Sequence, residues 1–227
     1  MTRRLGPALV RWTGRAEGDL GHGGRWVATD GVDAAVAARR AAVLDRPWSW
    51  LRQVHGDRVV VVTEPGGGCG EEADAAVTTD EWATLVVFTA DCAPVALASP
   101  EGVLGVAHVG WKGLALGVLD RTIDAMRALG ATAVDAAVGP CIRPECYEFG
   151  EDDLDRVAAS AGDEVRATTA AGRPALDIVA GVTAALTGAG VDSVHDEHAC
   201  TACDPDRWFS HRARRDTGRQ ATLVWRP

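Results

Sequence analysis

The chain has 227 residues, of which 47% are hydrophobic and 24% are charged, close to the average for globular proteins. This composition excludes a disordered or fibrous chain, and the net charge of −9 argues against non-specific nucleic-acid binding through a basic face. No run of about 18 apolar residues occurs, so we expect no membrane span. The opening stretch MTRRLGPALVRW has neither a long apolar segment nor a small-residue cleavage site, which predicts no secretory signal. We therefore expect a cytoplasmic protein whose six cysteines are thiols or metal ligands.

The first half of the chain alternates between strand-like and helix-like patterns. TLVVFT has the short, apolar, β-branched composition of a buried strand, and VALA and VLGVA flank a turn, which predicts a hairpin. Asp33 is a candidate N-cap for one helix, and an apolar stripe from Leu116 to Met126 indicates another. In chain order, the predicted elements are strands 8–12 and 25–27, helix 33–44, strands 58–62, 84–89, 95–98 and 103–107, and helix 114–129.

The second half continues the same mixture. We expect strands at 133–139, 191–195 and 221–225, and helices at 151–161 and 177–187. No internal repeat, low-complexity linker or change of composition separates the two halves. The sequence therefore predicts one α+β domain spanning residues 1–227, with its strands and helices arranged in layers.

Three candidate metal ligands share one local setting. His55, Cys92 and His108 each lie at a junction between a strand and a loop, within QVHG, ADCAP and HVGW. Imidazole nitrogen and thiolate sulfur both suit zinc, and three protein ligands leave a fourth position for water or substrate, as in catalytic sites. The spacing is compatible with an alternative, in which Cys92 is a buried thiol and the histidines bond to the backbone.

Five ordered motifs carry a resemblance to a known family. They are QVHG (53–56), TADCAPV (89–95), GVAHVGWKG (105–113), VGPCIRPECYEFG (138–150) and FSHRARRDTGR (209–219). The chain resembles the laccase-domain proteins, once named multicopper polyphenol oxidoreductases and now described as zinc-dependent purine nucleoside phosphorylases, some of which are linked to peptidoglycan editing. The sequence departs from the family's motifs at Val109, where alanine is usual, and at His211, where an aromatic residue is usual.

The resemblance implies a fold, a cofactor and a reaction. It implies a layered α/β/β/α domain similar to the cysteine-hydrolase-like group, with one zinc ion per chain bound by His55, Cys92 and His108. The implied substrates are a purine nucleoside (adenosine, inosine or methylthioadenosine) and phosphate, which give the free base and ribose 1-phosphate. Deamination of adenosine is implied as a side activity.

Further site residues are candidates on chemical grounds. An arginine fork can make two parallel bonds to phosphate, an aromatic ring can stack on a base, and a carboxylate beside Cys92 can orient a ligand or transfer a proton. For each of these side chains a solvated, capping or core role is the alternative. The candidate catalytic residues are Asp91, Arg52 and Arg143. The candidate substrate- and phosphate-binding residues are Arg212, Arg219, Trp111 and Tyr147.

A second cluster of potential ligands lies near the C-terminus. A Cys-x-x-Cys pair, Cys200 and Cys203, follows His195 and His198. This pattern is typical of a structural zinc knuckle or a redox pair. The sequence leaves open whether these four residues bind a second metal ion, and it also leaves the oligomeric state open.

Three other functions compete with phosphorolysis. A copper polyphenol oxidoreductase is one, because two histidines and a cysteine fit a blue-copper site, although six histidines are too few for a multicopper cluster. An amidase that edits a peptidoglycan precursor is the second, since the same zinc site could serve attack on an amide carbonyl. A binding module without catalytic activity is the third.

Overall fold

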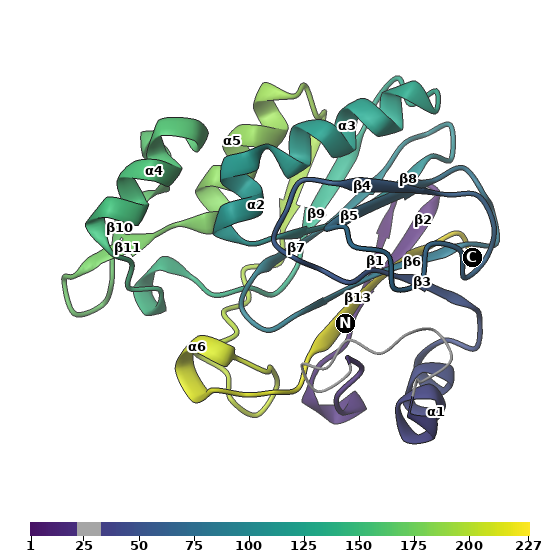
Figure 1. The fold of residues 1–227 in the computed structure, drawn as a ribbon, viewed down its shortest axis with the longest axis horizontal. Coiled ribbons are helices and arrows are strands. Elements are labelled where there is room, and N and C mark those ends of the chain that lie inside the picture. The colour runs from purple at the N-terminus through teal and green to yellow at the C-terminus, as the bar shows by residue number, and fades with distance from the viewer. Residues whose placement is uncertain (22–32) are drawn as a thin grey trace.

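Two β-sheets lie face to face at the centre of the fold in a computed structural model, which describes residues 1–21 and 33–227 (Figure 1). The first sheet has the strand order β1-β2-β13-β6-β3 and the second has the order β12-β9-β7-β8-β5-β4. The strands of the first sheet are β1 (Thr2–Leu5), β2 (Ala8–Trp12), β3 (Trp48–Trp50), β6 (Thr84–Thr89) and β13 (Gln220–Trp225). Those of the second are β4 (Val59–Val62), β5 (Ala75–Thr78), β7 (Ala93–Ala98), β8 (Leu104–Val109), β9 (Asp135–Val138) and β12 (Ser193–Asp196).

Helices cover the outer face of each sheet (Figure 1). The α-helices are α1 (Ala34–Val43), α2 (Trp111–Leu116), α3 (Val118–Ala128), α4 (Glu151–Ala161), α5 (Ile178–Gly188) and α6 (His211–Arg214). Short 3-10 turns form η1 (Arg15–Glu17), η3 (Pro144–Cys146) and η4 (Asp163–Val165), and a small hairpin pairs β10 (Arg166–Thr168) with β11 (Pro174–Leu176). Helix α1 lies on the first sheet, and α2 to α5 lie on the side of the second sheet.

Three apolar clusters hold these layers together. In β7, Val95 and Leu97 belong to the core under α2–α5, whereas Ala96 and Ala98 belong to the core between the sheets. This division follows from the alternation of side chains across a strand. A third cluster joins α1 to the first sheet. The layered α/β/β/α arrangement confirms the predicted α+β fold class. The central strands β6, β7, β8 and β13 are buried throughout because both faces of their sheets are covered.

Most predicted elements are present, and the hairpin of residues 95–98 and 103–107 is confirmed as the antiparallel pair β7–β8. The single helix predicted at 114–129 is wrong. The chain is helical from Trp111 and is interrupted at Gly117, whose φ of 81° ends α2 and starts α3. The strand predicted at 25–27 lies outside the described residues. Strands β1, β3, β5, β10 and β11 were not predicted, and each of them has only three or four residues.

No helix within the described ranges is long and apolar enough to span a bilayer.

Candidate metal centre

The three predicted metal ligands converge at one end of the sheets. Cys92 lies where the chain passes from β6 in the first sheet to β7 in the second. His108 lies in β8 and pairs with Pro94 of β7, so the hairpin register places it near Cys92. His55 comes from the loop between β3 and β4. The ligand atoms of the three side chains lie within 4.8 Å of one another, and Cys92 Sγ is 3.7 Å from His55 Nε2. This group could hold a metal ion.

A buried carboxylate that sequence reasoning missed holds both histidines. Asp74 is fully buried just before β5, and its Oδ1 lies 2.8 Å from Nδ1 of His108. The same carboxylate accepts hydrogen bonds from the backbone N–H groups of Val54, His55 and Gly56, at 2.7 to 3.1 Å. The contact fixes the His108 ring with Nε2 left for a metal, as carboxylates behind metal-binding histidines commonly do. The only signal in the sequence is an acidic residue directly before an apolar strand.

Two non-glycine residues at the centre have left-handed backbones. His55 has a φ of 61° and Asp91, next to Cys92, has a φ of 103°. Such conformations cost about 1–3 kcal/mol each and persist only where surrounding contacts impose them. At His55 those contacts are the bonds from Asp74 to three successive backbone N–H groups. Backbone strain is therefore concentrated beside two of the three ligands.

The electrostatics of the centre favour a thiolate. Burial alone would raise the pKa of the Cys92 thiol, but the neighbouring imidazoles of His108 and His55 lower this pKa to about 6. Burial likewise opposes the charged form of His108, but the Cys92 sulfur and the Asp74 carboxylate raise its pKa. The thiolate is the form that ligates metals. The thiolate and the buried carboxylate give the centre a negative charge that a divalent cation would neutralise.

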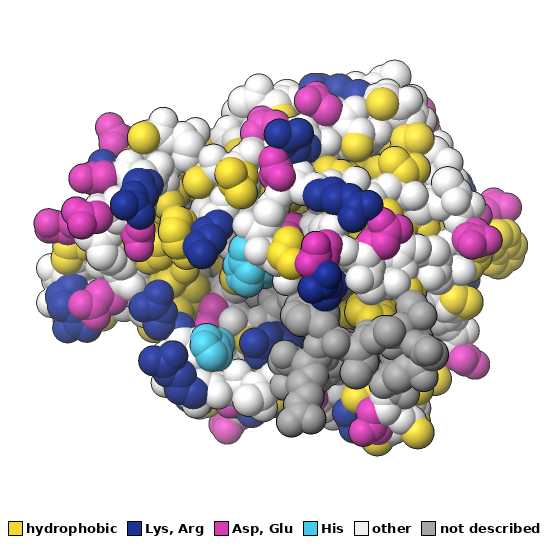
Figure 2. Space-filling model, in the orientation of Figure 1, with side chains coloured by type: hydrophobic (Ala, Val, Ile, Leu, Met, Phe, Trp, Pro, Cys, Tyr) yellow, Lys and Arg dark blue, Asp and Glu magenta, His cyan; other side chains and the backbone are white. Residues whose placement is uncertain are grey.

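The ligands lie on the wall of a cavity of about 530 Å³, a size typical of small-molecule sites. Figure 2 shows histidine and basic side chains gathered around a hollow on this face of the molecule. The described residues that line the cavity, besides the ligands, include Gln53, Phe88, Asp91, Trp111, Lys112, Tyr147, His211, Arg212 and Arg219. All four predicted substrate-binding residues are among them.

Two aromatic rings of the cavity wall, Trp111 and Tyr147, contact a third ring, and each of the two lies beside a cation. The ring of Phe149 makes edge-to-face contacts with Trp111 and Tyr147, with centroids 5.6 and 5.4 Å apart. The guanidinium of Arg212 lies 5.0 Å from the centroid of Tyr147, and Nζ of Lys112 lies 5.4 Å from that of Trp111. Lys112 was not among the predicted site residues, although it directly follows Trp111 in the motif. This wall can stack on a flat apolar group and bind an anion beside it.

Asp91 connects Cys92 to the segment that carries Arg212. Its Oδ2 accepts a hydrogen bond from the backbone N–H of Arg212 at 2.6 Å, and its Oδ1 accepts one from Thr201 Oγ1 at 2.7 Å. Arg219 also lines the cavity, and its guanidinium donates to three nearby backbone carbonyls. The carboxylate of Asp91 therefore joins two distant segments of chain at the cavity.

Two predicted catalytic arginines lie outside the described lining of the cavity. Arg52 forms an ion pair with Glu72 near the surface. Arg143 makes a two-pronged ion pair with Asp196 and is largely shielded from solvent. Arg143 lies in the family motif VGPCIRPECYEFG and Arg52 directly precedes QVHG, but each guanidinium group already forms an ion pair with a carboxylate.

The second predicted cluster is grouped differently in the structure. Cys200 and Cys203 lie close to Cys146 and Glu145, not to the histidines. His198 Nδ1 lies 3.1 Å from Asp196, and the exposed His195 is in β12. The sequence left open whether the four residues form one site, and the structure groups neither His195 nor His198 with the two cysteines.

The absence of a side chain at Gly110 is required by the ligands. A Cβ there would lie 2.6 Å from Cδ2 of His55 and 3.2 Å from Sγ of Cys92. The backbone itself, with a φ of −84°, suits alanine. We expect Gly110→Ala to displace the His55 ring and weaken metal binding by about 10-fold or more, measured by competition with a chromophoric chelator.

Gly150→Ala is the matched control for this prediction. Gly150 is also an N-cap without a side-chain bond and has a φ of −67°, and a Cβ at this position would meet no atom within 4 Å. Any general cost of alanine at an N-cap is therefore shared by the two variants. Equal metal affinities in both variants would show that Gly110 does not shape the centre.

These features define a layered α+β protein with a His–Cys–His group, able to hold a metal ion, on the wall of a cavity that fits a small molecule. The family model described as "Multi-copper polyphenol oxidoreductase laccase" matches residues 28–227. The chain belongs to this family, and the resemblance drawn from its motifs is confirmed.

Several proteins with names or solved structures are similar to this chain. A purine nucleoside phosphorylase of Mycobacterium tuberculosis is 40% identical over 201 residues, which cover 85% of this chain and 80% of that protein. A purine nucleoside phosphorylase of Xylella fastidiosa is 42% identical over 189 residues, covering 78% and 71% of the two chains. Among solved structures, a DUF152 protein of Neisseria meningitidis has a TM-score of 0.80 at 27% identity, covering 99% of this chain and 98% of that one. YlmD of Geobacillus stearothermophilus has a TM-score of 0.80 at 26% identity, covering 96% and 91%.

Proposed function

We propose that this protein is a cytoplasmic, zinc-dependent purine nucleoside phosphorylase, with residues 1–227 acting as one catalytic domain. The proposed substrates are adenosine, inosine or methylthioadenosine together with phosphate, and the proposed side activity is deamination of adenosine. One observation carries the proposal: the His55–Cys92–His108 group opens onto a cavity whose wall offers both stacking rings and cations. Relatives that are about 40% identical and named purine nucleoside phosphorylases support it.

The donor set favours zinc over copper. A blue-copper centre adds a weak axial methionine, glutamine or carbonyl ligand to two histidines and a cysteine. No methionine is among the described lining residues, and the side-chain amide of Gln53 both donates to and accepts from the backbone of Phe88, at 2.7 and 2.8 Å. Three ligands with one open position match a catalytic zinc site instead.

The proposed reaction forms a bond between a phosphate oxygen and the anomeric carbon of ribose, and breaks the bond from that carbon to the purine nitrogen. The purine nitrogen takes up one proton and hydrogen phosphate gives up one, so the reaction is balanced. A zinc ion bound at the centre would supply Lewis acidity for developing negative charge. Lys112 and Arg212, which lie beside the rings of Trp111 and Tyr147, would bind phosphate. Arg219 would add positive charge to the same cavity. Tyr147 and Trp111 would stack on the purine.

We assign positioning roles to the three predicted catalytic residues. Asp91 would hold Arg212 in place, since both of its carboxylate oxygens already accept hydrogen bonds. Arg143 would fix the loop that carries Tyr147 through its ion pair with Asp196. Arg52, paired with Glu72, would support the backbone that leads to His55.

The proposal is tested by incubating the zinc-loaded protein with inosine in the presence and absence of phosphate. We expect hypoxanthine and ribose 1-phosphate in equal amounts, and no reaction without phosphate. Adenosine without phosphate tests deamination, and a muramyl-peptide nucleotide tests the amidase alternative. Release of an amino acid from that nucleotide, with no hypoxanthine from inosine under saturating phosphate, would replace phosphorolysis with amide hydrolysis as the function.

A further inference from the structure

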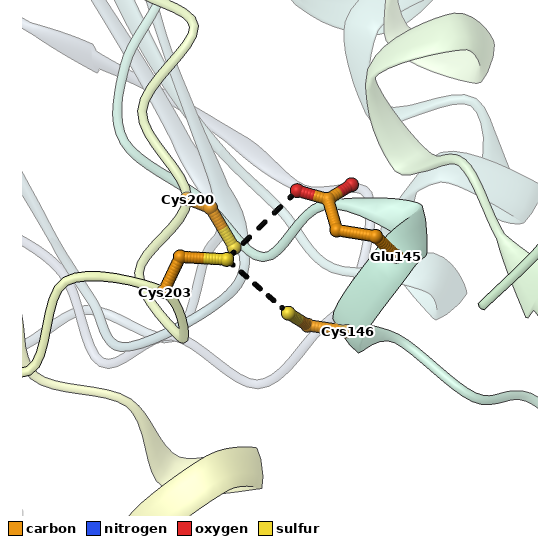
Figure 3. Close-up of side chains that lie close together, drawn as sticks. All are labelled: Glu145, Cys146, Cys200 and Cys203. Carbon is orange, nitrogen blue, oxygen red and sulfur yellow. Dashed lines mark hydrogen bonds between the residues drawn. The ribbon is translucent and has the colours of Figure 1, made fainter. Parts of the chain in front are cut away.

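A second group of potential metal ligands lies away from the His–Cys–His centre. Cys146 ends the turn η3, and Cys200 and Cys203 belong to the segment that follows β12. Figure 3 shows these three thiols and the carboxylate of Glu145 pointing toward one another from two segments. The four ligand atoms lie within 4.8 Å of one another, although Cys146 and Cys203 are 57 residues apart in the chain.

The backbone fixes the two segments that carry these side chains. Cys141 and Cys200 form a parallel β-bridge, in which the N–H of Cys141 donates to the carbonyl of Ala199 and the N–H of Thr201 donates to the carbonyl of Cys141, at 3.2 and 3.0 Å. The ion pair between Arg143 and Asp196 joins the same two segments a few residues away. The thiols are therefore held together by ordered backbone.

The distances within the group suit a small tetrahedral ion. Cys146 Sγ and Cys203 Sγ are 3.3 Å apart, and Cys203 Sγ is 3.9 Å from Glu145 Oε1. With Zn–S bonds of about 2.3 Å, two sulfurs on a tetrahedral zinc ion lie about 3.8 Å apart, so the Cys146–Cys203 distance is within about half an ångström of that geometry. The remaining ligand atoms, including Cys200 Sγ, lie within 4.8 Å of these two. Thiolate sulfur is also the ligand type that selects zinc over the hard cations.

We propose that Cys146, Cys200, Cys203 and Glu145 bind a second zinc ion with a structural role. The protein supplies all four ligands, so no position remains for a substrate, as is typical of structural zinc sites. The inference is independent of the proposed phosphorolysis, because its test measures metal and not turnover.

The Glu145, Cys146, Cys200 and Cys203 group lies directly beside residues that shape the cavity. Cys146 precedes Tyr147, which lines the cavity, and Cys200 precedes Thr201, whose hydroxyl bonds to Asp91. Arg214, in the same segment as Arg212, donates to the carbonyl of Thr201 at 3.0 Å. A zinc ion here would clamp together the two segments that form this wall of the cavity.

The test is a count of metal per chain by plasma mass spectrometry, on protein purified with a thiol reductant and without chelator. We expect two zinc ions in the parent protein, one in Cys203→Ser, one in Cys92→Ser and none in the double variant. Cys69→Ser is the matched control, because Cys69 is a half-buried thiol that donates to the carbonyl of Trp48 and belongs to neither group. It should retain two zinc ions, as should a variant with both His195 and His198 replaced by alanine.

A second readout covers the case in which Cys203→Ser folds poorly. The Cys92→Ser protein, loaded with cobalt in place of zinc, should show a thiolate-to-cobalt charge-transfer band of the strength given by three thiolates. Glu145→Ala, at an exposed position, should release this metal to a chelator faster than its parent. One zinc ion in the parent protein, or a Cys146–Cys203 disulfide found by mass spectrometry in its place, would overturn the proposal, as would a Cys203→Ser protein with an unchanged metal count.

Discussion

Replacing Cys92 with serine is expected to remove the metal ion from the His55–Cys92–His108 centre and to lower phosphorolysis by at least about 100-fold. The reason is that the thiolate is the only anionic ligand of the three, and a serine hydroxyl stays protonated at neutral pH. Changing a residue that merely supports a ligand already costs about 10–100-fold in metal affinity or activity, so loss of a ligand costs at least the upper value. Zinc content and hypoxanthine release are the measurements.

Cys69→Ser controls for loss of a thiol elsewhere, and it should keep both zinc and turnover. If Cys92→Ser retained the zinc content of the parent and its rate of phosphorolysis, the centre would not be the site of the reaction. If Cys92→Ser lost zinc at this centre but kept full turnover, the metal would be structural and the proposed zinc dependence of the reaction would be wrong.

Asp74→Asn is expected to weaken metal binding by about 10–100-fold, the range seen when a carboxylate behind a metal-binding histidine is changed. Whichever oxygen becomes the amide, two hydrogen-bond donors among Val54, His55, Gly56 and His108 then face an NH₂ group. Leaving a buried donor without an acceptor costs about 1–3 kcal/mol. The free energy of unfolding of the metal-free protein should therefore fall by several kcal/mol, as measured by urea denaturation.

Asp177→Asn is the matched control for this variant. Asp177 accepts hydrogen bonds from the backbone N–H groups of Val179 and Ala180 at the start of α5. Asparagine caps a helix about as well as aspartate, so this control should change neither stability nor metal affinity appreciably. A metal affinity of Asp74→Asn equal to that of the control would mean that Asp74 does not orient the histidines.

Only those residues of the candidate site that lie in short sequence motifs could be predicted from the sequence. His55, Cys92 and His108 were found because each lies in a short motif beside a glycine or proline. Asp74 was missed, since the residue that ties the histidines together lies 19 residues from His55 and 34 from His108 and has no motif of its own. Arg143 was found through its motif, but a motif does not show that the carboxylate of Asp196 already forms an ion pair with this guanidinium.

The sequence by itself determined most of the long apolar strands of the two central sheets, the amphipathic helices and the three residues of the His55–Cys92–His108 group, which could hold a metal ion. Periodicity and residue chemistry act over a few positions, and these features need no more than that. The tertiary structure alone decided that Cys200 and Cys203 meet Cys146 and Glu145, and not the histidines that precede them. That choice depends on the parallel pairing of β9 with β12, which brings together segments more than 50 residues apart and is set by the packing of the whole second sheet.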